Sequence, residues 1–189
     1  MKVRSSGIRK PQMWDSLFDI DMVLRKLQVD SHVQMLAEVG SGLGTFTIPA
    51  AKKISGKVYA FDIDEEMIAY LNQRLEEQQI KNVIPVLRDV LDDTTGLDNN
   101  TVDYVMLFNI LHYEKPEEFF NEAYRILNPG GKIGIMHWRS DITTPGGPEM
   151  SIRPKPEDIL NHIDDSKFEI IQQPLMLEPY HYGMVIAKK

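Results

Sequence analysis

The sequence contains no cysteine, which excludes disulfides, thiolate metal sites and a cysteine nucleophile. No apolar stretch approaches the roughly 20 residues of a membrane-spanning helix. The N-terminal residues carry charges but no apolar core of the kind that marks a signal peptide. The chain also has no H-E-x-x-H, calcium-loop or phosphate-loop pattern. We therefore expect a cytoplasmic protein with no membrane segment and no metal site.

Basic residues are in short supply, with 21 Lys and Arg against 28 Asp and Glu and a net charge of −7. An acidic chain repels phosphate backbones, so we expect neither a nucleic-acid nor an anionic-membrane partner. The length of 189 residues and the 42% hydrophobic content are ordinary for one globular domain. We expect a single domain over residues 1–189, and nothing in the sequence indicates its oligomeric state.

Short apolar runs alternate along the chain with amphipathic stretches of helical period. The expected strands are residues 33–39, 57–61, 82–87, 102–108, 132–138, 168–173 and 183–187. Helices are expected to begin near Thr45, Asp64, Pro116 and Glu157. This alternation predicts an α/β fold, a doubly wound and mostly parallel seven-stranded sheet with helices on both faces.

Two further segments flank this pattern. Apolar residues at helical spacing from Trp14 to Leu27 predict an N-terminal helical cap within residues 1–30. Residues 139–156 are rich in proline and glycine, which predicts a loop on the substrate side of the sheet. Between the helix at Pro116 and the next strand, residues 128–131 predict a turn.

A glycine-rich turn follows the first expected strand, with Gly40, Gly42 and Gly44 two residues apart and Glu38 just before them. Glycines let a backbone approach a ligand closely, and the helix start beyond them offers N–H groups. Asp62 ends the next strand 20 residues after Gly42. An acid at this distance commonly binds the ribose hydroxyls of an adenosine, although it could also cap the next helix.

Two details separate this turn from a dinucleotide site. The sixth position of the dinucleotide fingerprint, normally glycine, holds Thr45. Glu38 would repel a pyrophosphate but suits a ligand that carries positive charge. These residues argue against NAD.

These motifs resemble those of the class I S-adenosylmethionine-dependent methyltransferases over roughly Met35 to Trp138. The matching segments, in the family's order, are the acid with G-x-G-x-G at residues 38–44, the acid-ended strand at 61–67, the acid at 88–90, the strand region at 103–112 and the turn at 127–131. The resemblance implies the methyltransferase fold with an antiparallel last strand. It also implies S-adenosylmethionine as cofactor, with S-adenosylhomocysteine as its product.

The resemblance further implies a set of cofactor-binding residues. They are Glu38, Gly40, Ser41, Gly42, Asp62, Ile63, Asp89, Val90 and Asn109. By resemblance, Glu38 would approach the ammonium group of the cofactor, Asp62 the ribose hydroxyls and Asp89 the exocyclic amine of adenine.

The sequence identifies no catalytic residue firmly, and the family often uses no dedicated base. His112 and His137 are candidates near the ends of two strands, and each is open to a structural role instead. We expect methyl transfer to an unidentified small-molecule acceptor. Two alternatives stay open: a non-catalytic adenosyl-ligand-binding or partner subunit, and an NAD-dependent oxidoreductase.

Overall fold

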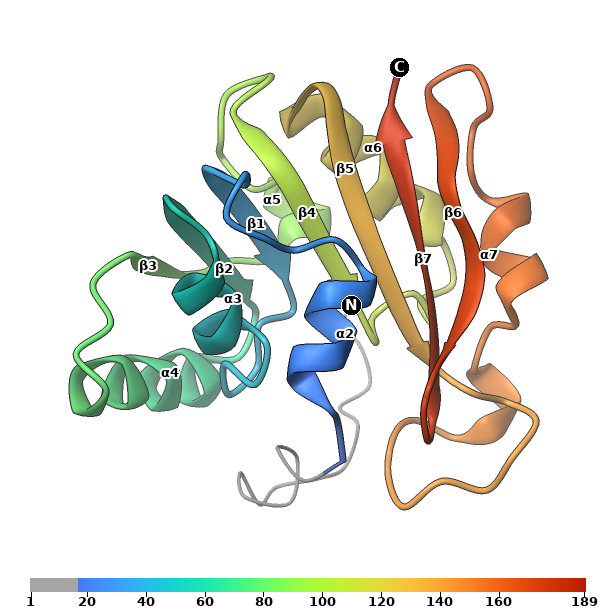
Figure 1. The fold of residues 1–189 in the computed structure, drawn as a ribbon, viewed down its shortest axis with the longest axis horizontal. Coiled ribbons are helices and arrows are strands. Elements are labelled where there is room, and N and C mark those ends of the chain that lie inside the picture. The colour runs from blue at the N-terminus through green and yellow to red at the C-terminus, as the bar shows by residue number, and fades with distance from the viewer. Residues whose placement is uncertain (1–16) are drawn as a thin grey trace.

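The computed structural model describes residues 17–189 and contains one seven-stranded sheet in the order β3-β2-β1-β4-β5-β7-β6 (Figure 1). The strands are β1 Met35–Val39, β2 Lys57–Asp62, β3 Val83–Leu87, β4 Val102–Phe108, β5 Leu127–Trp138, β6 Phe168–Leu177 and β7 His181–Lys188. Strand β7 runs antiparallel to both of its neighbours, β5 and β6, while β1 to β5 pair in parallel. The predicted fold class, including the antiparallel last strand, is confirmed.

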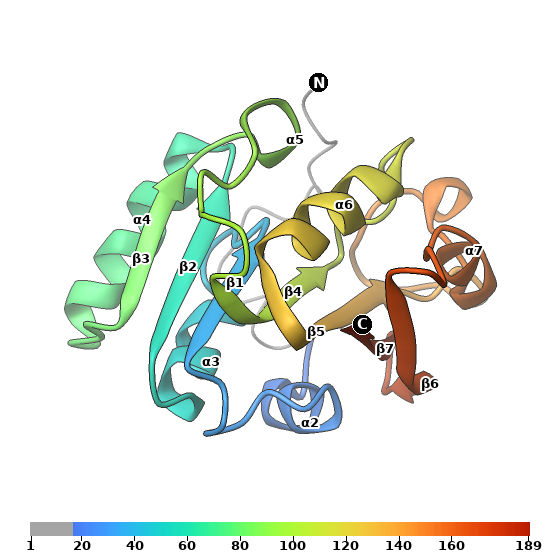
Figure 2. The ribbon, with the colours of Figure 1, turned by 90° about the horizontal axis from the view of Figure 1, so that it is seen from above.

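Helices cover both faces of the sheet, as Figure 2 shows. They are α2 Ile20–Lys26, α3 Thr47–Lys53, α4 Glu65–Glu77, α5 Val90–Asp93, α6 Pro116–Ile126 and α7 Pro156–Asn161, with a 3₁₀ turn, η1, at Met150–Ile152. Helices α2, α3 and α4 pack on one face, and α5, α6 and α7 on the other. Of the expected N-terminal cap, α2 is present, while residues 1–16, with Trp14, lie outside the described part of the chain.

The central strands β1, β4, β5 and β7 are largely buried on both sides because helices cover both faces of the sheet, whereas the edge strands β3 and β6 are partly exposed. In β4, Tyr104 and Met106 pack toward α2 and α3, whereas Val105 and Leu107 pack toward α6. Side chains that alternate in this way build two separate cores from one strand.

No helix in the described part of the chain combines the length and apolar character needed to cross a bilayer.

Strand β5 begins five residues earlier than expected. The helix before it ends at Ile126, as the Asn-Pro-Gly-Gly segment predicts, but Leu127 already pairs with Val102. A register shift after Val102 then accommodates residues 128–131 within the strand. Strand β6 likewise continues past Pro174 to Leu177, because an edge strand with a register irregularity tolerates proline.

The sheet reverses its strand order beside β1. From β1 the chain builds outward through β2 and β3 on one side, and through β4 and β5 on the other. In open α/β sheets the crevice beyond the carboxyl ends of the strands at such a point is where ligands bind. The residues that follow β1, β2 and β4 therefore define the site.

Candidate functional site

A cavity of about 930 Å³ lies at the carboxyl ends of β1, β2 and β4. All nine residues expected to bind the cofactor line it: Glu38, Gly40, Ser41, Gly42, Asp62, Ile63, Asp89, Val90 and Asn109. His112 lines it too, whereas His137 does not. The structure thus brings together residues from four separate segments that were selected by motif alone.

Glycine is required at the centre of the turn after β1. Gly40 has a φ of +77°, and a Cβ there would lie 2.7 Å from Cγ2 of Ile110. The N–H groups of Gly40 and Ser41 both donate to the carbonyl of Phe61, at 2.8 and 2.9 Å, which ties the turn to β2. Gly42, with a φ of +51°, has open space where its Cβ would stand. The turn therefore presents bare backbone beside the cavity.

Each carboxylate oxygen of Asp62 accepts a hydrogen bond from a backbone N–H group. Oδ2 accepts from the N–H of Gly42 at 2.7 Å, and Oδ1 accepts from the N–H of Asp64 at 2.9 Å. The N-cap of α4 is Asp64, whose side chain accepts from the N–H of Glu66. A carboxylate can accept about four hydrogen bonds. Asp62 thus keeps capacity for ligand hydroxyls while it fixes the turn.

Glu38 is a buried carboxyl, only 3% exposed, at the end of β1. Its Oε2 accepts a hydrogen bond from Oγ1 of Thr47 at 2.5 Å. Burial raises the pKa of Glu38 to about 8, and the nearby Asp62 charge contributes in the same direction. Burial also raises the pKa of Asp62. A cationic ligand would favour the ionised form of both groups.

The cavity lining is strongly acidic. Among the described residues, its carboxylates are Glu38, Asp62, Asp64, Glu65, Glu66 and Asp89, and its single guanidinium is that of Arg88. This charge distribution attracts cations and repels a pyrophosphate. Among residues 17–189, no group of three His, Asp or Glu side chains could hold a metal ion.

Two buried polar atoms beside the cavity have no hydrogen-bond partner among the described residues. They are Oγ of Ser41 and Oδ1 of Asn109. Buried polar atoms are nearly always satisfied, so these two point to a polar ligand. With the open side of Gly42 and the acidic lining, they fit the polar, positively charged methionine portion of S-adenosylmethionine.

The residues expected around adenine occupy different surroundings. Asp89 caps α5, since its Oδ1 accepts from the N–H groups of Leu91 and Asp92 at 3.0 and 3.3 Å. Val90 is buried, whereas Ile63 is 39% exposed at the rim. Asp89 therefore has a structural role that the sequence did not indicate, beside its place in the cavity.

His112 and His137, the two candidate catalytic residues, contact each other. Nε2 of His137 lies 3.4 Å from Nδ1 of His112, and the rings meet edge to face with centroids 5.5 Å apart. His137 is fully buried in β5, and burial lowers its pKa to about 3. His181, on β7, packs against Trp138 with ring centroids 4.0 Å apart, and its pKa is likewise lowered to about 3 by burial.

Arg153 is a residue of this region that the sequence analysis missed. Its guanidinium donates to the carbonyls of Pro148, Arg139 and Gly146 and to Oγ1 of Thr144. It also lies over the ring of Trp138, at 5.6 Å from the centroid. A lone arginine in a proline-rich loop gave no signal for this role. It anchors the loop of residues 139–148 to the end of β5.

Comparisons with known proteins agree with this geometry. Residues 36–131, just over half of the chain, match the methyltransferase domain family. A solved S-adenosylmethionine-dependent methyltransferase from Aquifex aeolicus shares the fold with a TM-score of 0.83 and 23% identity, covering 95% of this chain and 94% of that one.

Two relatives of known activity match shorter segments. The catalytic subunit of a tRNA (adenine(58)-N(1))-methyltransferase from Yarrowia lipolytica is 32% identical over 48% of this chain and 23% of its own length. A ubiquinone/menaquinone biosynthesis C-methyltransferase from Roseobacter denitrificans is 29% identical over 56% of this chain and 42% of its own. The chain thus spans less than half the length of either relative.

The family match covers the glycine turn, Asp62, Asp89 and Asn109, which are the residues gathered at the cavity. The fold match extends over nearly the whole chain. By family and by fold, the chain belongs to the class I S-adenosylmethionine-dependent methyltransferases.

Proposed function

We propose that the chain transfers a methyl group from S-adenosylmethionine to a small-molecule acceptor. The observation that carries this proposal is the single cavity that collects the glycine turn, Glu38, Asp62 and Asn109. The cofactor supplies a methyl group on a positively charged sulfur, which is a good leaving group. The chain's part is to bind the cofactor, align the acceptor and exclude water.

The charge of the chain supports a small acceptor over a nucleic acid. The net charge is −7, and residues 17–189 contribute six carboxylates and one arginine to the cavity lining. A polyanionic RNA gains little from such a surface. We therefore favour an acceptor of the small-molecule kind, although one relative acts on tRNA.

Titration calorimetry tests the proposal directly. S-adenosylmethionine and S-adenosylhomocysteine should each bind, and NAD should give no heat because its pyrophosphate meets the acidic lining. A ligand at 100 times its Kd should also add about 2.7 kcal/mol of stability in thermal unfolding. Binding of NAD alone would contradict the proposal and favour an oxidoreductase.

A further inference from the structure

We propose that the methyl acceptor is a small, uncharged aromatic molecule that binds in the larger cavity against three phenylalanine side chains. These are Phe18, Phe46 and Phe108, and together they form what we call the aromatic wall. This inference rests on the proposed function and specifies its acceptor.

The lining of the larger cavity changes along the carboxyl edge of the sheet. Its carboxylates come from β1 and from the segments that follow β2 and β3. Phe108 ends β4, the next strand in the sheet order, and Phe46 is the N-cap residue of α3. Phe18 precedes α2, which packs on the same face of the sheet as α3. One end of the cavity is therefore acidic and the other end is aromatic.

The three rings of the aromatic wall meet close to edge on. The ring centroids of Phe18 and Phe46 lie 5.0 Å apart with the ring planes at 75°, and those of Phe46 and Phe108 lie 5.1 Å apart at 85°. Phe46 and Phe108 are 6% and 5% exposed, so the surrounding core fixes their positions. Aromatic rings prefer such contacts, and a further ring can extend them.

Phe18 packs against side chains at the end of β5 and the start of β7. Its ring centroid lies 4.7 Å from that of His181 and 5.9 Å from that of Trp138. The guanidinium of Arg153 lies over the ring of Trp138 in turn. The aromatic wall is thus continuous with a packed cluster that joins β5, β7 and the loop that Arg153 anchors.

The aromatic wall begins where the reacting end of the cofactor is expected. Phe46 closely follows the glycine turn, and Phe108 directly precedes Asn109. The turn and Asn109 are expected to hold the methionine portion, which carries the methyl group. The adenosine portion is expected at Asp62 and Asp89, after β2 and β3. An acceptor on the aromatic wall would then lie on the methyl side of the cofactor.

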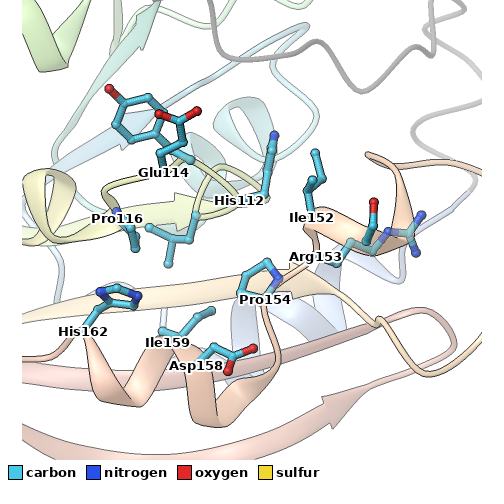
Figure 3. Close-up of a pocket in the computed structure, with 12 residues that line it drawn as sticks. His112, Glu114, Pro116, Ile152, Arg153, Pro154, Asp158, Ile159 and His162 are labelled. Atoms are coloured by element: carbon cyan, nitrogen blue, oxygen red, sulfur yellow. The ribbon is translucent and has the colours of Figure 1, made fainter.

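The volumes of two cavities also favour the larger one as the acceptor site. It measures about 930 Å³, near the top of the roughly 300–1,000 Å³ typical of ligand pockets, which leaves room for a small acceptor beside the cofactor. A second cavity, between residues 111–116 and the segment from η1 to α7, measures about 230 Å³ and falls below that range (Figure 3). Tyr113 is the one phenyl-type ring among its described lining residues, so this cavity has no aromatic wall.

Electrostatics argues against an ionic acceptor. The cofactor's sulfur is positively charged, so it would repel a cationic acceptor at the point of transfer. An anionic acceptor would meet the partly negative faces of the rings and the carboxylates of the lining. Arg88, the only arginine or lysine among the described lining residues, follows β3 at the acidic end and donates to the carbonyl of Asp93. An uncharged ring meets neither repulsion.

The transfer balances with such an acceptor. Its nucleophilic atom forms a bond to the methyl carbon, and the carbon–sulfur bond breaks with its electron pair left on sulfur. Where that atom is a hydroxyl oxygen, its proton passes to water. The aromatic wall takes no part in making or breaking bonds, and it contributes by orienting the acceptor toward the methyl group.

Nuclear magnetic resonance on the full chain, with ¹³C-labelled phenylalanine rings, tests where the acceptor binds. The chain is saturated with sinefungin, a cofactor analogue that has a protonated amine in place of the methylated sulfur and cannot transfer a methyl group. The probe 2-naphthol should shift the ring signals of Phe46 and Phe108, which Phe46→Leu and Phe108→Leu assign. Phe168, a buried phenylalanine that lines neither cavity, should keep its signal in place. Shifts confined to rings outside the aromatic wall, or no shift, would overturn the proposal.

Calorimetry on the same complex at pH 7 tests the chemical class of the acceptor. 2-Naphthol should bind about tenfold more tightly than decahydro-2-naphthol, which has the same skeleton without aromatic rings. 2-Naphthoate and 2-naphthylmethylammonium should each bind at least about tenfold more weakly than 2-naphthol. Equal affinity for the saturated alcohol, or tighter binding of either ion, would contradict an uncharged aromatic acceptor.

Matched variants test the aromatic wall itself. Phe108→Leu keeps an apolar side chain in the core but removes one ring of the wall, so it should weaken 2-naphthol binding about fivefold. Phe168→Leu makes the same change in the core on the opposite face of the sheet and should leave the affinity unchanged. Equal weakening in both variants would show that the wall has no specific role.

The outcomes separate this inference from the proposed function. If the chain binds S-adenosylmethionine and sinefungin but 2-naphthol fails the tests above, only the acceptor class and the aromatic wall are overturned. If the chain binds neither S-adenosylmethionine nor sinefungin, the proposed function itself is overturned.

Discussion

The two sides of the sheet's carboxyl edge are constructed differently. The proposed cofactor side is formed by consecutive residues, the turn 38–44, together with one acid at the end of the neighbouring strand. The proposed acceptor side, around the ends of β4 and β5, joins side chains that are far apart in the sequence. They are those of His112, His137, Arg153 and His181. A ligand bound through backbone leaves a short sequence pattern, whereas one bound through packed side chains leaves none.

The two sides also respond differently to charge. Burial keeps Glu38 neutral at pH 7, with a pKa of about 8, and it keeps His137 neutral, with a pKa of about 3. A cation in the larger cavity reverses this preference for Glu38, because the attraction favours its ionised form. The buried histidine has Arg153 among its neighbours, which opposes any charge on it. One side is thus set to ionise on binding and the other to stay neutral.

The largest expected effect is a loss of stability caused by a substitution on the proposed acceptor side, with cofactor affinity nearly unchanged. Arg153→Ala leaves four buried or partly buried oxygen atoms without their donor and should lower the free energy of unfolding by about 3 kcal/mol. Urea denaturation measures the loss, and calorimetry should show nearly wild-type affinity for S-adenosylhomocysteine. Arg139→Ala is the control, because its ion pair with Asp141 lies at the surface and should matter little. If Arg153→Ala also lost affinity for S-adenosylhomocysteine by a similar free energy, the two sides would not be energetically independent.

The next effect tests the cofactor side alone. Asp62→Ala removes a charged hydrogen-bond acceptor and should weaken S-adenosylmethionine binding by about 2 kcal/mol, or roughly 30-fold. Asp64→Ala removes the cap of α4 and should cost about 1 kcal/mol of stability with a much smaller change in affinity. Calorimetry and urea denaturation of both variants separate the two roles. Equal losses of affinity in the two variants would make Asp62 a structural residue only.

The smallest effect concerns pH. Since the pKa of Glu38 is about 8 in the folded chain and near 4.5 unfolded, its stabilising contribution is complete below pH 4.5 and is lost as pH rises to 8. A cationic cofactor needs the ionised form, so its affinity should rise with pH, by up to about tenfold per unit below 8. Calorimetry in buffers of different ionisation enthalpy should detect proton release on binding.

Two matched variants test whether Glu38 is the group that releases the proton when the cofactor binds. Glu38→Gln should abolish the release, whereas Glu77→Gln, an exposed residue at the end of α4, should leave it unchanged. Binding without proton release in the wild-type chain would mean that Glu38 stays neutral beside the cofactor. The contrast in charge between the two sides would then disappear.

Local patterns in the sequence predicted much of the fold. Strand β4 lies at Val102–Phe108 as expected, and Asp64 caps α4. The boundaries that differ depend on pairing between distant segments, which no local pattern encodes. Leu127 joins β5 because Val102 is its partner, and β6 crosses Pro174 because it is an edge strand.

The same distinction holds for the site. The residues chosen from the glycine turn and the two following acids all line one cavity, although their binding roles stay predictions. The contact between His112 and His137 depends on β4 and β5 being neighbours, so the sequence could name both without pairing them. Arg153 could not be chosen, because its partners are mainly backbone carbonyls.

The acidic lining of the larger cavity has a consequence for turnover. In the proposed reaction, methyl transfer removes the positive charge from sulfur, so S-adenosylhomocysteine leaves with one unit of charge less than S-adenosylmethionine brought. Carboxylates attract the positively charged sulfur of S-adenosylmethionine but not the uncharged thioether sulfur of S-adenosylhomocysteine. The acidic lining therefore favours S-adenosylmethionine over S-adenosylhomocysteine, and in the proposed reaction it would favour replacement of the product by fresh cofactor after each transfer.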